Sequence, residues 1–227
     1  SNAFLDATLF YEILLGEIVT RGGDPATGYS LILEAARRVN DERLYRRAVD
    51  IALQSRSGQP ALTAAQAWAG AWPPSVDAHR YVLQILVALH RSNRSAGPFL
   101  QVLALHGPAD RAAFMLALPP LYAKVSDKAL AASMVEKALQ NSLSDPAVSA
   151  TAWTVVGRMR LLSDNQQGAL EAARKAQDLA PLEDKPAILA LELLEAGATE
   201  AEPLLRRYLD GKPSPEIRLA YARLLLE

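Results

Sequence analysis

The chain has 227 residues, half of them hydrophobic, with 24 basic and 25 acidic residues and a formal net charge of −1. A net charge this close to zero argues against bulk electrostatic attraction to nucleic acid, and no run approaches the roughly 18 apolar residues that a membrane span needs. The absence of cysteine excludes disulfides, thiolate catalysis and cysteine-ligated metals.

The first three residues, Ser1-Asn2-Ala3, are typical of the remnant left when a purification tag is cleaved, so they are excluded from fold reasoning. The natural start is therefore expected upstream of residue 4. A signal peptide or a lipid-attachment cysteine would lie there if the protein has one.

From residue 4 onward, apolar residues recur at helical spacing nearly everywhere, and no segment alternates as a half-buried strand does. Cap residues and helix breakers interrupt this pattern at intervals of roughly 15 to 20 residues. Asp24-Pro25 and Asp145-Pro146 are helix starts, because Asp caps the first turn and Pro is tolerated in it. The sequence predicts an all-α chain whose helices are mostly three to four turns long.

Taken in chain order, the helices fall into pairs of about 34 residues. The predicted windows are 8–41, 42–75, 76–109, a longer irregular window at 110–149, then 150–183, 184–215 and a partial window at 216–227. Pro119-Pro120 lies inside the first helix of the irregular window, and it predicts a kink or a break because proline lacks the N–H and clashes with the preceding turn. The prediction is one continuous array over 4–227, with about six helix pairs and a leftover C-terminal helix.

The pair at 150–183 has the most regular pattern. Its first helix carries Trp153 and Gly157, its second carries Ala169 and Ala176, and Pro181 stops the second helix just past its end. Gly157 and Ala169 are small residues where two helices are expected to approach closely. The equivalent packing positions of the earlier windows hold Tyr45, Trp68 and Phe99.

This spacing resembles the tetratricopeptide repeat, a helix–turn–helix unit of about 34 residues. The resemblance implies a right-handed superhelical array whose first helices line a concave groove that binds peptides or partner helices. The family's groove positions fall on Arg43, Arg46, Asp50, Asp77, Arg80, Gln84, Thr151, Thr154 and Arg158. The arginines would clamp a carboxylate bidentately; the alternative is that these residues are only the solvated faces of amphipathic helices.

Three segments have a narrower resemblance. Residues 10–18, 43–52 and 217–225 look like helices of a group of proteobacterial repeat lipoproteins, one class of which is an adaptor of a carboxyl-terminal processing protease at the outer membrane. That resemblance implies a lipid-anchored scaffold on the periplasmic side of the outer membrane, longer than this chain, with a periplasmic protease as a partner.

Charge is distributed unevenly along the chain. From Arg37 to Arg111 there are ten arginines and five acids, whereas from Ser163 to Glu202 there are nine acids and three bases. The N-terminal half is therefore expected to attract an acidic surface and the later repeats a basic one. Alternatively, the two regions attract each other, within a ring or between subunits, or the distribution is chance.

No motif points to catalysis, a cofactor or a metal. His79 and His90 would lie on one helix face about 16 Å apart along its axis, too far for one metal ion, and no phosphate-binding glycine loop or catalytic triad is present. The sequence thus predicts a non-catalytic scaffold or adaptor with protein partners, no cofactor and no nucleic acid.

Three alternatives remain. One is a cytoplasmic adaptor or co-chaperone of the same fold, and another is a helical-repeat enzyme, which would need convergent carboxylates in a pocket. The third is self-association through the last helix, whose apolar face has no following helix to cover it; that face comprises Leu219, Ala220, Leu224 and Leu225. This uncovered face predicts that the array continues beyond residue 227 or meets another chain.

Overall fold

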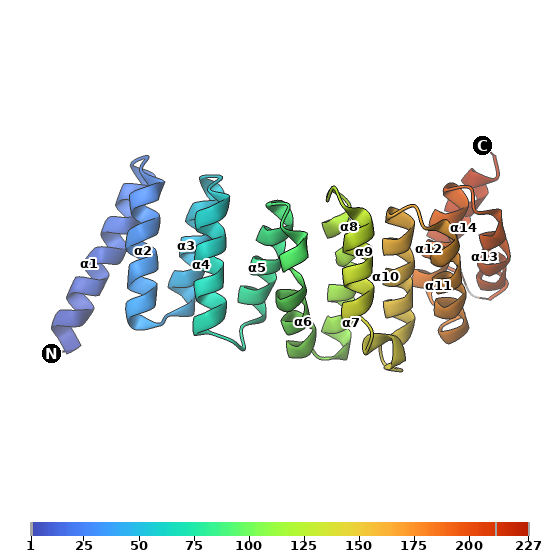
Figure 1. Ribbon diagram of the computed structural model, residues 1–227, viewed down its shortest axis with the longest axis horizontal. Coiled ribbons are helices and arrows are strands. Elements are labelled where there is room, and N and C mark those ends of the chain that lie inside the picture. Colours follow the sequence, from blue (N-terminus) through green and yellow to red (C-terminus); the bar gives the residue numbers. More distant parts are fainter. Residues whose placement is uncertain (1, 212, 227) are drawn as a thin grey trace. The chain divides into compact units, whose positions relative to one another are not determined.

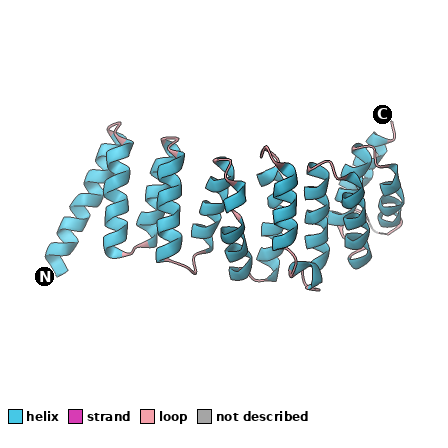
Figure 2. Cartoon of the chain, in the orientation of Figure 1, coloured by secondary structure: helices cyan, strands magenta, loops and turns pink. Residues whose placement is uncertain are grey.

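The computed structural model describes the backbone of residues 2–211 and 213–226, and the side chains within these ranges from residue 7 onward. All regular secondary structure in these ranges is helical (Figure 2), so the predicted all-α class is confirmed. The chain divides into two compact units, Ser1–Leu105 (unit 1) and His106–Glu227 (unit 2). The continuity of the array between the units and its superhelical hand stay predictions.

Unit 1 is built from helix pairs. The pairs are α1 (Asn2–Arg21) with α2 (Pro25–Val39), α3 (Glu42–Gln54) with α4 (Gly58–Ala71), and α5 (Val76–Ala88) with α6 (Ala96–Leu105), which a short 3-10 helix (Ser92–Arg94) precedes. Each helix packs on the next one along the chain (Figure 1). We call α1, α3 and α5 first helices and α2, α4 and α6 second helices.

Polar side chains start these helices where the sequence pattern breaks. Asp24 accepts a hydrogen bond from the Thr27 N–H (3.1 Å), and Asp41 accepts one from the Arg43 N–H (2.8 Å). An N-cap acceptor of this kind satisfies a backbone donor that has no partner inside the helix. The helix starts therefore follow from local sequence.

The core of unit 1 is centred on Trp68, which is 1% exposed. Its ring lies 5.7 Å from that of Tyr81, and its indole N–H donates to Glu42 Oε1 at 3.0 Å. Tyr45 on α3 is buried in the same cluster, and Phe99 is buried on α6. The large side chains predicted to pack between helices in this unit are thus all internal.

Unit 2 continues with the same kind of pairs after an irregular start. Its helices are α7 (Pro108–Leu116), α8 (Leu118–Tyr122), α9 (Lys128–Ala138), α10 (Ser149–Leu162), α11 (Gln166–Leu179), α12 (Asp184–Glu195), α13 (Glu202–Leu209) and α14 (Pro215–Leu224). The expected break at Pro119-Pro120 is confirmed: α7 ends at Leu116, and both prolines lie in the first turn of α8, where a missing N–H costs no helix bond. In this unit α8, α10, α12 and α14 are the first helices. The helix start predicted at Asp145-Pro146 is wrong: α10 begins only at Ser149, because the Asp145 carboxylate accepts a hydrogen bond from the Ala147 N–H in the turn before the helix (3.0 Å).

Small residues let the helices of unit 2 approach closely. Gly157 on α10 faces Ala169 and Ala172 on α11, and both alanines are fully buried, as is Ala176. Trp153 is only partly buried, and the Lys175 ammonium lies 4.1 Å above its ring. Helix α11 ends at Leu179, two residues before Pro181.

The last helix is partly covered. Ala220 and Leu224 pack against a cluster formed by Leu205, Tyr208 and Ile217, so two of the four residues expected to be uncovered contact the preceding pair. Leu219 and Leu225 remain 54% and 64% exposed. The open apolar surface of α14 is therefore smaller than the sequence predicts, because the helix rotates half of that face inward.

Candidate functional site

The first helices of unit 1 bring three of the predicted groove residues together. Asp77 on α5 lies 2.7 Å from Arg80 on the same helix and 3.6 Å from Arg46 on α3. The two arginines share one carboxylate, and their side chains remain about half exposed, at 45% for Arg80 and 52% for Arg46. This cluster therefore retains positive charge that an acidic group of a partner could reach.

The other predicted residues of unit 1 differ in their surroundings. Arg43 donates to its own cap residue Asp41 (2.7 Å), yet its side chain is 90% exposed. Asp50 is partly buried on α3, and Gln84 is exposed on α5. These residues lie on neighbouring first helices, but only Arg46, Asp77 and Arg80 form one contact network.

The sequence pattern did not predict the ion pair between Arg47 and Glu17. Arg47 on α3 binds Glu17 on α1 through two hydrogen bonds, 2.6 Å and 2.8 Å long. The hydrogen bond from Arg47 lowers the pKa of the Glu17 carboxyl, and it raises the pKa of Arg47 in turn. Opposite charges about one repeat apart are the signal for such a pair, because successive first helices place these positions side by side.

The same signal recurs in unit 2. Arg158 on α10 binds Glu192 on α12, 34 residues away, and Arg111 binds Asp145, also 34 residues away. Arg158 was predicted as a groove residue, but its guanidinium is already held by this carboxylate, and its side chain is 29% exposed.

Thr151 and Thr154 differ from the groove prediction. They are only 7% and 1% exposed, and the Thr154 hydroxyl donates to the Ala150 carbonyl one turn earlier (2.9 Å). Helix α10 is covered on several sides by α9, α11 and α12, so these two side chains present little surface to a partner. The family's positions do not carry over at these two residues because α10 is more enclosed than α3 or α5.

A hollow of about 350 Å³ opens beside Arg158 and spans three first helices. Its walls come from α8, α10 and α12, and its lining residues are Pro119, Pro120, Ala123, Arg158, Leu161, Leu162 and Glu192. The walls are mostly apolar, and the Arg158–Glu192 ion pair supplies the polar groups. Such a hollow can take one apolar side chain of a partner while the ion pair meets its polar backbone.

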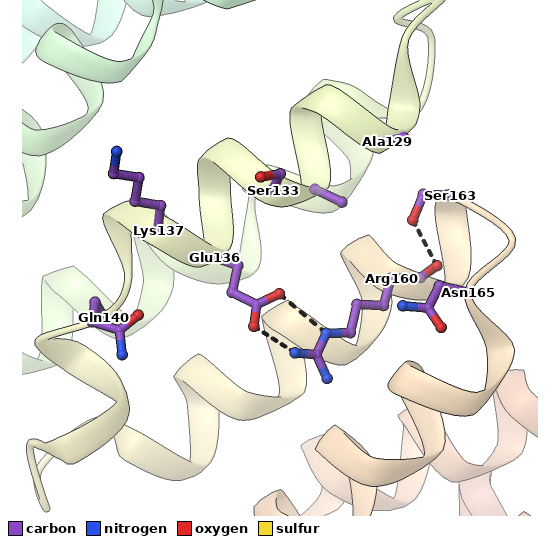
Figure 3. Close-up of a pocket in the computed structure, with 9 residues that line it drawn as sticks. Ala129, Ser133, Glu136, Lys137, Gln140, Arg160, Ser163 and Asn165 are labelled. Carbon is purple, nitrogen blue, oxygen red and sulfur yellow. Dashed lines mark hydrogen bonds and ion pairs between the residues drawn. The ribbon is translucent and has the colours of Figure 1, made fainter.

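A second hollow, of about 500 Å³, lies between α9 and the α10–α11 pair (Figure 3). Glu136 on α9 binds Arg160 on α10, whose guanidinium also donates to the Gly168 carbonyl (2.9 Å). Figure 3 shows the Lys137 side chain pointing away from this pair. The Glu136–Arg160 ion pair thus joins α9 to α10 at this hollow.

Neither hollow has the features of a reaction centre. Each is lined by one carboxylate, and that carboxylate is bound by an arginine. Within residues 2–211 and 213–226, no group of three His, Asp or Glu side chains is placed to hold a metal ion. The described helices also include none with the length and apolarity to cross a membrane.

An apolar stripe is exposed on α1. Tyr11, Leu14 and Ile18 are 64%, 45% and 57% exposed, and Phe10 beside them is 68% exposed. The positions of α3 that correspond to Tyr11, Leu14 and Ile18 are Tyr45, Ala48 and Ala52. These three residues are buried, because α2 packs against α3. The stripe is thus the face that a preceding second helix covers elsewhere in unit 1.

Comparison with known proteins gives likeness in structure alone. No protein-family model matches the chain, and no curated protein is detectably similar in sequence. The type IV pilus biogenesis factor PilW aligns over 94% of this chain and 98% of its own, with 18% identity and a TM-score of 0.46. A tetratricopeptide repeat protein from Parabacteroides merdae aligns over 97% and 86%, with 11% identity and a TM-score of 0.45. A thermophilic tetratricopeptide repeat protein of Thermus thermophilus aligns over 82% and 99%, with 20% identity and a TM-score of 0.36.

The helices described above define the class: an all-α protein made of consecutive packed helix pairs.

Proposed function

We propose that this protein is a non-catalytic scaffold of the tetratricopeptide type that binds a segment of a partner protein along its first helices. The observation that carries the proposal is the hollow spanning α8, α10 and α12, whose apolar walls are interrupted by one ion pair. Helical-repeat surfaces of this kind bind partners without chemistry of their own. The arginine-rich cluster on α3 and α5 adds a second contact region for an acidic segment.

Site-specific photo-crosslinking tests the proposal. A photoreactive amino acid replaces Leu162, which lines the hollow, and a matched variant places it at Glu171, which is exposed on the second helix α11. Cells expressing each variant are irradiated, and the adducts are identified by mass spectrometry. We expect a discrete protein adduct from position 162 and none from position 171. Equal adducts from both positions, or none from either, would contradict the proposal.

A substitution that weakens binding provides a second test of whether the partner contacts the hollow. Leu162→Arg should place a charge in the apolar hollow and weaken capture of the crosslinked partner, while Glu171→Arg should leave capture unchanged. Circular dichroism of both variants checks that the helices remain folded.

In its specific form, the proposal places the protein on the periplasmic side of the bacterial outer membrane, as a lipid-anchored adaptor of a carboxyl-terminal processing protease. Support comes from the resemblance of residues 10–18, 43–52 and 217–225 to helices of such adaptors. Cell fractionation tests the location, and a pull-down from the periplasmic fraction tests the partner. Recovery only in the cytoplasm would favour the cytoplasmic adaptor, and a periplasmic pull-down without the protease or its regulators would remove the specific partner.

A further inference from the structure

The turns that join the two helices of each pair carry mainly basic residues in unit 1. These turns, with the helix residue before each, cover residues 21–24, 54–57 and 88–95, and they lie along one edge of the unit (Figure 1). They contain Arg21, Arg56, His90, Arg91 and Arg94 against a single acid, Asp24. The Asp24 carboxylate caps α2, which lowers its pKa by hydrogen bonding to Thr27. We call this surface the basic edge.

The equivalent turns of unit 2 carry the opposite sign. They cover residues 122–127, 162–165 and 195–201, and they also share one edge of their unit. They contain Asp127, Asp164, Glu195 and Glu200 against a single base, Lys124. We call this surface the acidic edge.

The charged groups on these edges are largely available. Arg56 and Arg94 are exposed, and within the described residues neither guanidinium group has a hydrogen bond or an ion pair. Asp164, Glu195 and Glu200 are also exposed, and in the described part of the chain their carboxylates have no hydrogen bond or ion pair. Asp127 caps α9, and Arg91 donates to Gln59, so these two are partly engaged.

One matching turn position holds opposite charges in the two units. Each of five such turns has one residue in the left-handed backbone conformation: Gly23 (φ 97°), Arg56 (φ 56°) and His90 (φ 57°) in unit 1, and Asp164 (φ 61°) and Gly197 (φ 88°) in unit 2. Arg56 and Asp164 therefore stand at equivalent places in their pairs. On each edge, the turns recur once per helix pair. Charges along one edge can therefore face opposite charges along the other.

We infer that the basic edge of unit 1 docks on the acidic edge of unit 2 in a second copy of this chain. Charge complementarity selects the second copy, because both edges carry exposed charges of opposite sign in turns that recur about once per helix pair along the sequence. The net charge of −1 adds almost no repulsion between copies. The contact joins two different surfaces, so it is heterologous, and it either closes into a ring or extends the assembly.

An electrostatic contact of this kind has a defined salt dependence. The Debye length is about 30 Å at 0.01 M salt and about 3 Å at 1 M salt. Light scattering over a range of protein concentrations should therefore show a mass above the monomer at low salt and the monomer mass at high salt.

Charge-reversal variants test whether self-association depends on the two edges rather than on the rest of the surface. R56E/R94E and D164R/E200R should each weaken self-association by about tenfold or more, because several exposed pairs become repulsive. R37E/R174E changes the net charge as much as R56E/R94E does, at exposed residues away from both edges, and should keep the wild-type mass. An equimolar mixture of the two edge variants should associate again, because each supplies the charge that the other has lost.

Three outcomes would overturn the inference: a monomer mass at low salt at every concentration, self-association that the edge variants do not weaken, or failure of the mixed variants to associate. Duplex DNA and anionic lipid vesicles serve as added probes. Binding of either probe by the wild type without any self-association would assign the basic edge to a polyanion and overturn the inference as well. The photo-crosslinking result at Leu162 is independent of all these outcomes.

Discussion

Gly157 of α10 lies so close to Leu189 of α12 that a Cβ atom on residue 157 would stand 2.5 Å from Leu189 Cδ2. The same atom would lie 3.3 Å from the Ala172 Cβ on α11. Leu189 is fully buried, so its side chain has no open space to move into. A glycine is what allows these three helices to meet at one point.

Gly157→Leu should therefore overpack this contact and lower the free energy of unfolding by about 1–3 kcal/mol. Urea denaturation followed by circular dichroism measures the change. Gly70→Ala is the matched control, because a Cβ there meets open space and alanine is favoured over glycine within a helix by about 0.5–1 kcal/mol. A neutral Gly157→Leu variant would show that the three helices separate at little cost.

The sequence predicts local features of this fold well. Helix periodicity, the cap Asp24, the small residue at 157 and the break at Pro119-Pro120 all depend on neighbours within a few residues or on the repeat spacing. Each of these features can therefore be predicted from the order of residues along the chain.

The candidate site was predicted less well. The pairing of Arg47 with Glu17 and of Arg158 with Glu192 depends on which positions of successive helices face each other. The burial of Thr154 depends on how many helices surround α10. Both are properties of tertiary packing, which a single helix pattern does not encode.

The pairing of Glu17 with Arg47 should make stability depend on pH. The pKa of Glu17 is lowered from its usual 4.5 in the folded protein, so its contribution is present above that value and is lost as pH falls through the folded pKa. We expect Glu17→Gln to destabilise the protein by about 1 kcal/mol near pH 7 and by much less near pH 3. Urea titrations of the variant and the wild type at both pH values measure the difference.

Glu171→Gln is the control for this experiment, since Glu171 is exposed on α11. It should change the free energy of unfolding little at either pH. If the Glu17→Gln difference were the same at pH 3 as at pH 7, the carboxylate–guanidinium pair would not be the source of the stability.

Removing the acceptor of the Trp68 indole should be costly. Glu42 accepts from both the Trp68 N–H and the Ser75 hydroxyl, so Glu42→Ala leaves a buried donor unpaired. We expect a loss of about 1–3 kcal/mol, and a smaller loss for Glu42→Gln, which keeps a carbonyl acceptor. Thermal unfolding followed by tryptophan fluorescence measures both. Glu34→Ala is the control, because its side chain is 72% exposed, and a loss as large as that of Glu42→Ala would contradict the role of the indole hydrogen bond.

Destabilisation should remain local to the helices that surround the substitution. Each helix of an array packs chiefly on its neighbours, so the free energy of opening differs from place to place. Hydrogen exchange followed by mass spectrometry reads each helix separately. Gly157→Leu should speed exchange in α10, α11 and α12 and leave α3 and α4 nearly unchanged.

Trp68→Ala provides the reciprocal test, because Trp68 is buried among α3, α4 and α5 and its truncation should cost about 3–5 kcal/mol. Exchange should then rise in those three helices and remain slow in α10 and α11. If either variant speeded exchange equally in every helix, the chain would unfold as one cooperative body, because a local loss of packing would then be transmitted through all the helix pairs.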